Sequence, residues 1–197
     1  MHQPHLPAKI TLAWLATLLL LWQLPALATP GREADPALRQ VLLRAIEDGT
    51  SFSDPFEAEV WLLDMSRRLQ SRLPDPGERI GLLRLIHQEA TRAGLPPELV
   101  LAVIEVESNF DRWAISRSGA QGLMQVMPFW LQEIGHPEDN LLDPRTNLRL
   151  GCAILRYYLD LEGGDLGRAL ARYNGSLGRT RYSRRVLDAL SRRWYRQ

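Results

Sequence analysis

Proline-led helix starts recur along this chain, and strand-like alternation of apolar and polar residues is almost absent. Proline suits the first turn of a helix, because its φ is already helical and that turn needs no backbone donor. Such starts occur at Pro55, at Pro76, in the LPPEL stretch (95–99) and at Pro144. The expected helices span about residues 36–47, 55–73, 76–93, 95–108, 128–134, 144–161, 165–173 and 182 onward. The pattern predicts one mainly α domain.

The first 28 residues are expected to leave the mature chain. They carry one charge, Lys9, then an apolar stretch of about 15 residues and a small-x-small ending, Ala26-Leu27-Ala28. This order is typical of a secretory signal peptide and predicts a periplasmic protein. The apolar stretch is short for a membrane span, which needs about 20 residues, although an uncleaved anchor remains the alternative.

The composition of the remaining chain excludes several function classes. Lys9 is the only lysine, so the mature chain balances 23 arginines against 23 acidic residues. It therefore has no lysine for a P-loop or a Schiff base, and its charge gives no case for nucleic acid. Only His87, His136 and Cys152 remain as soft ligands, too few for a His/Cys metal site, so we expect no metal or cofactor. Cys152 lies on a helical pattern and is expected to be a small buried residue.

Two glutamates stand near the end of the apolar stretch LVLAVIEVESNFD, residues 99–111. On a helix, a residue shares its face with the positions three, four and seven before it. Before Glu107 these positions are all apolar: Ile104, Val103 and Val100. The face of Glu105 already carries a charge, Glu98. Glu105 is therefore expected to be a solvated or paired surface group, whose replacement by glutamine does little.

Glu107 is the exceptional residue, because its face would otherwise be buried. Desolvation and the negative end of the helix dipole both raise the pKa of a carboxyl in such a place. A carboxyl that is neutral near pH 7 can act as a general acid. On periodicity alone the alternative stays open, in which Glu107 caps the helix or pairs with an arginine.

Two ordered motifs lie downstream of this helix. The first begins at Glu107-Ser108 in ESNFDRWAISRSGAQGLMQVMPFW; it continues through Ser116, Ser118 and Gly119, and then through Gly122-Leu123-Met124-Gln125 and Met127-Pro128. The second is Ala171-Arg172-Tyr173-Asn174-Gly175. Together they resemble the signature of the soluble lytic transglycosylase family, which belongs with the goose-type lysozymes. The resemblance covers about residues 90 to 180.

The resemblance implies a lysozyme-like helical fold with at most a small β-hairpin near the cleft. Residues 93–197 would form the transglycosylase domain, behind an extra N-terminal helical layer at 29–92. The implied reaction is non-hydrolytic cleavage of the MurNAc–GlcNAc β-1,4 bond of peptidoglycan, which leaves 1,6-anhydromuramic ends. Glu107 would act as acid and then as base while the sugar's own C6 hydroxyl attacks. A muramidase, which normally needs a second carboxylate, and a non-catalytic peptidoglycan-binding protein are the alternatives.

The motif match also implies the residues that contact substrate. These are Ser116, Ser118, Met124, Gln125, Tyr173 and Asn174. Tyr173 is expected to donate to Glu107 or orient it, or else to be a packed aromatic at a helix end. Asn174 has a helix C-cap as its alternative role. Arg172, at a position that is usually small in the family, and the NGSLG continuation at 174–178 depart from the family pattern.

Seven arginines follow in RTRYSRRVLDALSRRWYRQ, residues 179–197. A solvated helix face is the simpler interpretation, and a surface for a membrane or an anionic polymer is the alternative. Peptide-bearing glycan itself carries carboxylates, so the segment does not require nucleic acid. The expected partners are peptidoglycan glycan strands, with peripheral membrane contact and proteins of the cell-wall or secretion machinery as further candidates.

Overall fold

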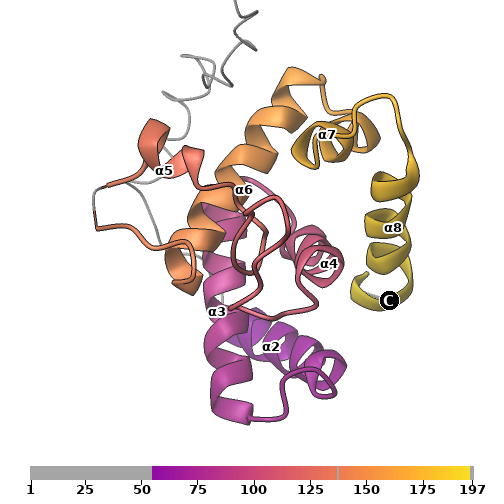
Figure 1. The fold of residues 1–197 in the computed structure, drawn as a ribbon. Coiled ribbons are helices and arrows are strands. Elements are labelled where there is room, and N and C mark those ends of the chain that lie inside the picture. Colours follow the sequence, from indigo (N-terminus) through magenta and orange to yellow (C-terminus); the bar gives the residue numbers. More distant parts are fainter. Residues whose placement is uncertain (1–54, 137, 196–197) are drawn as a thin grey trace, which may run out of the picture. The chain divides into compact units, whose positions relative to one another are not determined.

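A computed structural model describes residues 55–136 and 138–195, with side chains from residue 60 onward. The expected signal peptide at 1–28 and the helix at 36–47 lie outside the described residues. The described helices are α2 (Pro55–Leu69), α3 (Pro76–Arg92), α4 (Pro97–Glu107), α5 (Phe129–Ile134), α6 (Pro144–Leu161), α7 (Leu166–Tyr173), α8 (Arg181–Ala189) and a π-helical turn, η2 (Leu190–Trp194) (Figure 1). Within these residues, β pairing is limited to isolated bridges from Gln121 to Ile115 and Val126. The mainly α prediction is confirmed.

Aspartate side chains set the starts of three helices. Asp75 accepts a hydrogen bond from the Glu78 backbone N–H (2.6 Å), and Asp143 accepts one from that of Thr146 (2.9 Å). Asp165 begins α7 in the same way. Each carboxylate satisfies a donor that the first helical turn would otherwise leave unpaired. These local caps explain why the predicted starts agree closely with the observed ones.

The ends of two helices differ from the prediction. Helix α2 ends at Leu69, not at Leu73, and the Leu69 carbonyl then accepts hydrogen bonds from the N–H groups of Arg72 and Leu73. Leu73 precedes Pro74, and a residue before proline avoids the helical region. At the other end of the chain, α8 widens into the π-turn η2, which places Trp194 entirely in the core.

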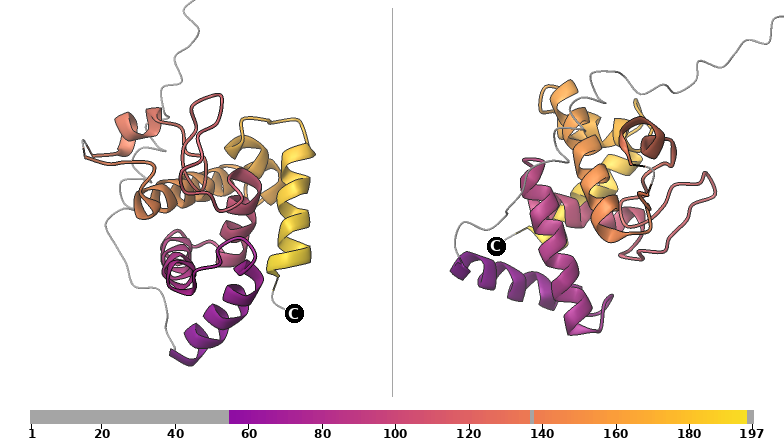
Figure 2. Two further views of the ribbon diagram at one scale, coloured as in Figure 1. Left: turned by 60° about the horizontal axis from the view of Figure 1, so that its bottom comes forward. Right: turned by 90° about the vertical axis from the view of Figure 1, so that its left-hand side faces the viewer.

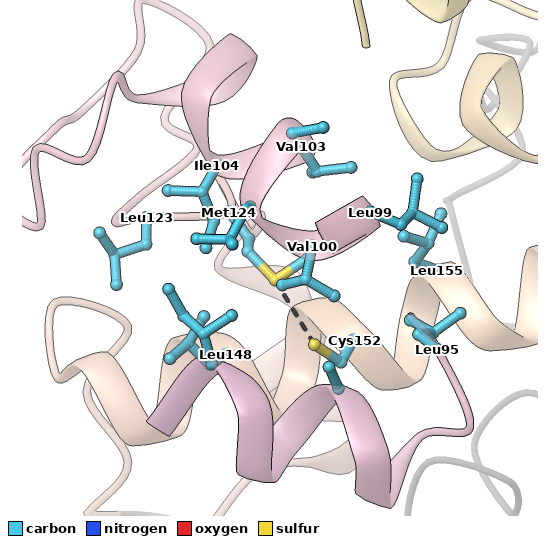
Figure 3. Close-up of a cluster of buried hydrophobic side chains, with 14 of the residues drawn as sticks. Leu95, Leu99, Val100, Val103, Ile104, Leu123, Met124, Leu148, Cys152 and Leu155 are labelled. Atoms are coloured by element: carbon cyan, nitrogen blue, oxygen red, sulfur yellow. Dashed lines mark hydrogen bonds between the residues drawn. The ribbon is translucent and has the colours of Figure 1, made fainter. Parts of the chain in front are cut away.

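Helix α4 is the centre of the core. Its residues from Leu99 to Ile104 are all buried, and α3, α8 and η2 pack against it. Helix α6 packs against α3 and α7. Figure 3 shows the side chains of α4 meeting those of α6 and of the loop at 123–124 in one cluster. The last turn of α4 is therefore held on a rigid support, with α8 running beside it (Figures 1 and 2).

Among the described residues, none of the helices has the length and apolar content that crossing a bilayer requires.

Candidate active site

Glu107 lies at the last position of α4, with its side chain largely enclosed by protein. Tyr182 from α8 donates its hydroxyl to Glu107 Oε1 at 2.6 Å. Burial raises the pKa of Glu107 from its ordinary value of 4.5 to about 7, while the Tyr182 hydrogen bond and the charge of Arg185 act in the opposite direction. A carboxyl in this state can release a proton near neutral pH and is stabilised by a donor once it has done so.

Glu105 was expected to be either solvated or paired. It is paired, and it is not solvated. Only 7% of its side chain is exposed. Its oxygens accept hydrogen bonds from Arg72 Nη2 (2.9 Å) and Trp194 Nε1 (2.7 Å), and it forms an ion pair with Arg193. Its own helix face gave no sign of these partners, because the turn after α2 and the π-turn η2 supply them from remote parts of the chain.

The expectation that Glu105→Gln does little must therefore be revised. Glutamine keeps one acceptor but removes the charge that two arginines share. We expect the free energy of unfolding to fall by about 2 kcal/mol, as is typical when a buried charge-assisted network is disrupted. Urea unfolding of the variant beside Glu138→Gln, an exposed glutamate of the same charge, measures the difference. Equal stability of the two variants would contradict a structural role for Glu105.

The loop after α4 contains the serines and Gln125 of the first motif. The Ser116 hydroxyl accepts from the Ala120 backbone N–H and lies 3.0 Å from that of Ser118, which is exposed. Gln125 has a left-handed backbone (φ 50°) and donates its amide to the carbonyls of Ala114 (3.1 Å) and Gly122 (3.0 Å). Gln125 thus ties the loop together, and Ser118 is the motif residue most open to a ligand.

Met124 does not reach the surface. Its side chain has no exposed area and packs against Gly151, with its sulfur 3.9 Å from Cys152 Sγ (Figure 3). A Cβ on Gly151 would lie 2.6 Å from the Met124 sulfur, so the glycine makes room for it. The structure gives the Met124 side chain a packing role, and Cys152 is buried as expected.

Asn147 is a buried residue that stabilises the loop through hydrogen bonds, and the sequence did not reveal this role. Its Oδ1 accepts from the Met124 backbone N–H (2.8 Å), and its Nδ2 donates to the carbonyls of Gln121 (2.8 Å) and Leu141 (2.9 Å). Gly122 has a positive φ and lies so close that an added Cβ would be 2.4 Å from Asn147 Nδ2. Asn147 and Gly122 together fix the loop beside the end of α4.

Tyr173 does not donate to Glu107. Its hydroxyl donates to the Met124 carbonyl at 2.7 Å, and Glu107 instead receives its hydrogen bond from Tyr182. Burial raises the pKa of both tyrosines, and the charge of Glu107 raises both further. Asn174 is the C-cap of α7, which was the alternative role expected for it. Its side chain is exposed.

The sequence does contain a pattern that predicts the burial of Tyr182, but the pattern lies in an arginine-rich segment. Tyr182, Val186 and Ala189 are spaced four and three residues apart, and all are buried against the core. This stripe is the buried face of an amphipathic helix. The expectation that arginines cover a solvated face is met, since Arg181, Arg184 and Arg185 are all exposed.

The comparisons with known proteins identify the family of this chain. A family model described as the transglycosylase SLT domain matches residues 84–192, more than half of the chain. The chain belongs to the transglycosylase SLT domain family. The resemblance drawn from the two motifs is therefore confirmed.

Curated relatives of this SLT domain include two proteins named membrane-bound lytic murein transglycosylase C. One is from Yersinia pestis (strain Pestoides F) and one from Yersinia pseudotuberculosis serotype O:1b (strain IP 31758). Each is 35% identical over 112 residues, which cover 49% of this chain and 31% of the relative. The chain thus spans about a third of the length of these relatives.

Two solved structures also align with part of this chain. An inactive mutant of lytic transglycosylase Slt from Pseudomonas aeruginosa is 34% identical, with a TM-score of 0.45, over 58% of this chain and 19% of that one. The 70 kDa soluble lytic transglycosylase from Escherichia coli is 26% identical, with a TM-score of 0.41, over 70% of this chain and 24% of that one. The matched SLT domain begins inside α3, whose buried Ile86 and Ala90 belong to the same core as α4.

Proposed function

We propose that this chain is a lytic transglycosylase that cleaves the MurNAc–GlcNAc β-1,4 bond of peptidoglycan and leaves 1,6-anhydromuramic ends. The single observation that carries the proposal is the environment of Glu107 within an SLT domain. Its burial raises the pKa to about 7, and its partner Tyr182 is a neutral donor, not a cation that would keep it ionised. Glu107 thus combines the family's motif position with the protonation state that an acid requires.

One carboxyl can serve both halves of this reaction. Glu107 gives its proton to the glycosidic oxygen as the C1–O bond breaks, and positive charge develops at C1 of the muramic residue. The resulting carboxylate accepts the proton of the muramic C6 hydroxyl, whose oxygen forms the new bond to C1. The proton lost in the first half is regained in the second, and water takes no part. The Tyr182 hydrogen bond stabilises the carboxylate between the two halves.

The charges around Glu107 support this route over hydrolysis. In the described part of the chain, the charged side chain that acts on the pKa of Glu107 is Arg185, and no carboxylate contributes. A hydrolase of either stereochemistry normally places a second carboxylate across the bond, to activate water or to attack C1. A substrate that supplies its own nucleophile needs none. We propose further that exposed polar side chains of the two motifs, such as Ser118 and Asn174, contact the glycan.

The proposed substrate and the predicted signal peptide point to the same cellular location. Peptidoglycan lies in the cell envelope, and the signal peptide predicted at 1–28 would direct the chain to the periplasm. The boundary between a helical layer at 29–92 and a catalytic domain at 93–197 stays a prediction.

Mass spectrometry of purified sacculi digested with the full chain tests the proposed reaction. The expected products are muropeptides with 1,6-anhydromuramic ends. Muropeptides with reducing ends would identify the chain as a muramidase. Absence of products, with retention of the chain on sacculi, would identify a peptidoglycan-binding protein.

Tyr182→Phe tests the second member of the site. Its hydroxyl stabilises the charged form of Glu107, so removing it raises the pKa of that carboxyl further. The high-pH limb of kcat/KM, which in the wild type falls as pH rises through about 7, should therefore move to higher pH. We expect kcat to fall about tenfold, the scale of a lost hydrogen bond to a charged group. Tyr173→Phe is the matched control, because its hydroxyl serves the Met124 carbonyl; a limb that moves equally in both variants would contradict the assignment.

A further inference from the structure

A pocket opens beside Tyr182 and is lined in part by its side chain. It has a volume of about 310 Å³. Its lining consists of Asn174, Ser176, Arg179, Arg181, Tyr182 and Arg185. Since Tyr182 also donates to Glu107, this pocket and the proposed acid share a wall. A group bound in the pocket would therefore lie beside the bond that Glu107 protonates.

The pocket carries positive charge that no acidic side chain of its own lining balances. Its three arginines form no ion pair with any described carboxylate, whereas the nearby Arg172 is paired with Glu162. No acidic side chain lines the pocket. Helix α8 begins at Arg181, so the positive end of its dipole adds to the same field. Guanidinium groups that line one pocket favour the binding of an anion there.

The sugar backbone of peptidoglycan does not account for this charge. Its amino sugars are acetylated, and the lactyl carboxyl of MurNAc forms an amide where a stem peptide is attached. The ionised groups are the free carboxylates of the stem peptide. Arginine forms bidentate hydrogen bonds to a carboxylate, and Asn174 and Ser176 offer neutral partners suited to peptide amides.

We propose that this pocket binds a carboxylate of the stem peptide carried by the muramic residue next to the cleaved bond. This inference rests on the proposed function and narrows it to a preference for peptide-bearing strands. Arg179 and Arg181 are specificity-determining residues in this scheme. Arg185 serves the same pocket but also acts on Glu107, so it is not used to test the pocket.

The test compares strands that carry stem peptides with strands from which an amidase has removed them. The wild type should show a higher kcat/KM on peptide-bearing strands. In Arg179→Gln/Arg181→Gln the ratio of the two kcat/KM values should fall about tenfold, as expected for lost charge-assisted hydrogen bonds. Added salt should reduce the wild-type ratio, because it screens exposed charges. Arg84→Gln/Arg184→Gln removes the same charge from exposed positions outside the pocket and should keep the wild-type ratio.

Binding measured in the Glu107→Gln background separates the two proposals. The pocket is supported if the arginine pair weakens binding to peptide-bearing strands and not to denuded ones. The inference is overturned if the ratio is unchanged, or if both substrates are lost equally. A wild type that binds peptide-bearing strands through these arginines but releases no anhydromuropeptides would overturn the proposed reaction and leave the pocket in place.

Discussion

Glu107→Gln should abolish turnover of peptidoglycan, with kcat reduced by about a thousandfold or more. Glutamine has nearly the same shape and can still accept the Tyr182 hydrogen bond, but it has no proton to give to the glycosidic oxygen. General acid and base catalysis each contribute roughly 10²- to 10⁴-fold, and here one group performs both. The loss should appear in kcat more than in KM, since the group acts on the transition state.

The neighbouring glutamate supplies the control for this experiment. Glu105→Gln alters the same helix two residues away, at a carboxylate held by Arg72, Arg193 and Trp194. We expect the Glu105 variant to lose stability and to keep most activity per folded molecule. The Glu107 variant should lose activity and keep its fold. Anhydromuropeptide release should rank the Glu105 variant above the Glu107 variant, and urea unfolding should rank them the other way round. Comparable losses of activity in the two variants at equal stability would contradict these roles.

The parts of the fold that could be predicted depend on short-range chemistry. Asp75, Asp143 and Asp165 cap helices through their own third neighbours, so a few adjacent residues contain the whole signal. The same holds for the apolar face that places Glu107 against the core. The stop of α2 at Leu69 was missed although Pro74 is a local signal for it. The π-turn at Leu190–Trp194 was missed because its Trp194 packs against remote parts of the core.

The site was predicted less completely, because its contacts join remote segments. Glu107 was identified from its helix face and its motif. Its hydrogen-bond partner was assigned to Tyr173, yet the structure assigns that role to Tyr182, 75 residues along the chain from Glu107. Both tyrosines lie near the carboxyl, so residue type and neighbourhood could not separate them. Asn147 escaped notice for the same reason: its three partners lie on the loops at 121–124 and at Leu141.

The environment that prepares Glu107 for catalysis should also weaken the fold above neutral pH. Burial favours the neutral carboxyl, so the pKa of about 7 in the folded state exceeds the ordinary value of 4.5 that applies when the chain unfolds. Below about pH 4.5 the carboxyl is protonated in both states, and the stabilisation by this group is fully present. As pH rises through about 7, that stabilisation is lost, because the folded state must then hold a buried charge.

Glu107→Gln should therefore make the protein more stable than the wild type at pH 8 but not at pH 4.5. The pKa difference corresponds to about 3 kcal/mol at high pH, since one unit is worth about 1.4 kcal/mol. Urea unfolding of both proteins at the two pH values isolates the effect, because other titrating groups cancel in the difference. The difference should be near zero at pH 4.5 and should widen toward its full value by pH 8. A difference that stays constant with pH would mean that Glu107 is ionised at no cost, and a carboxyl of that kind could not be the acid proposed here.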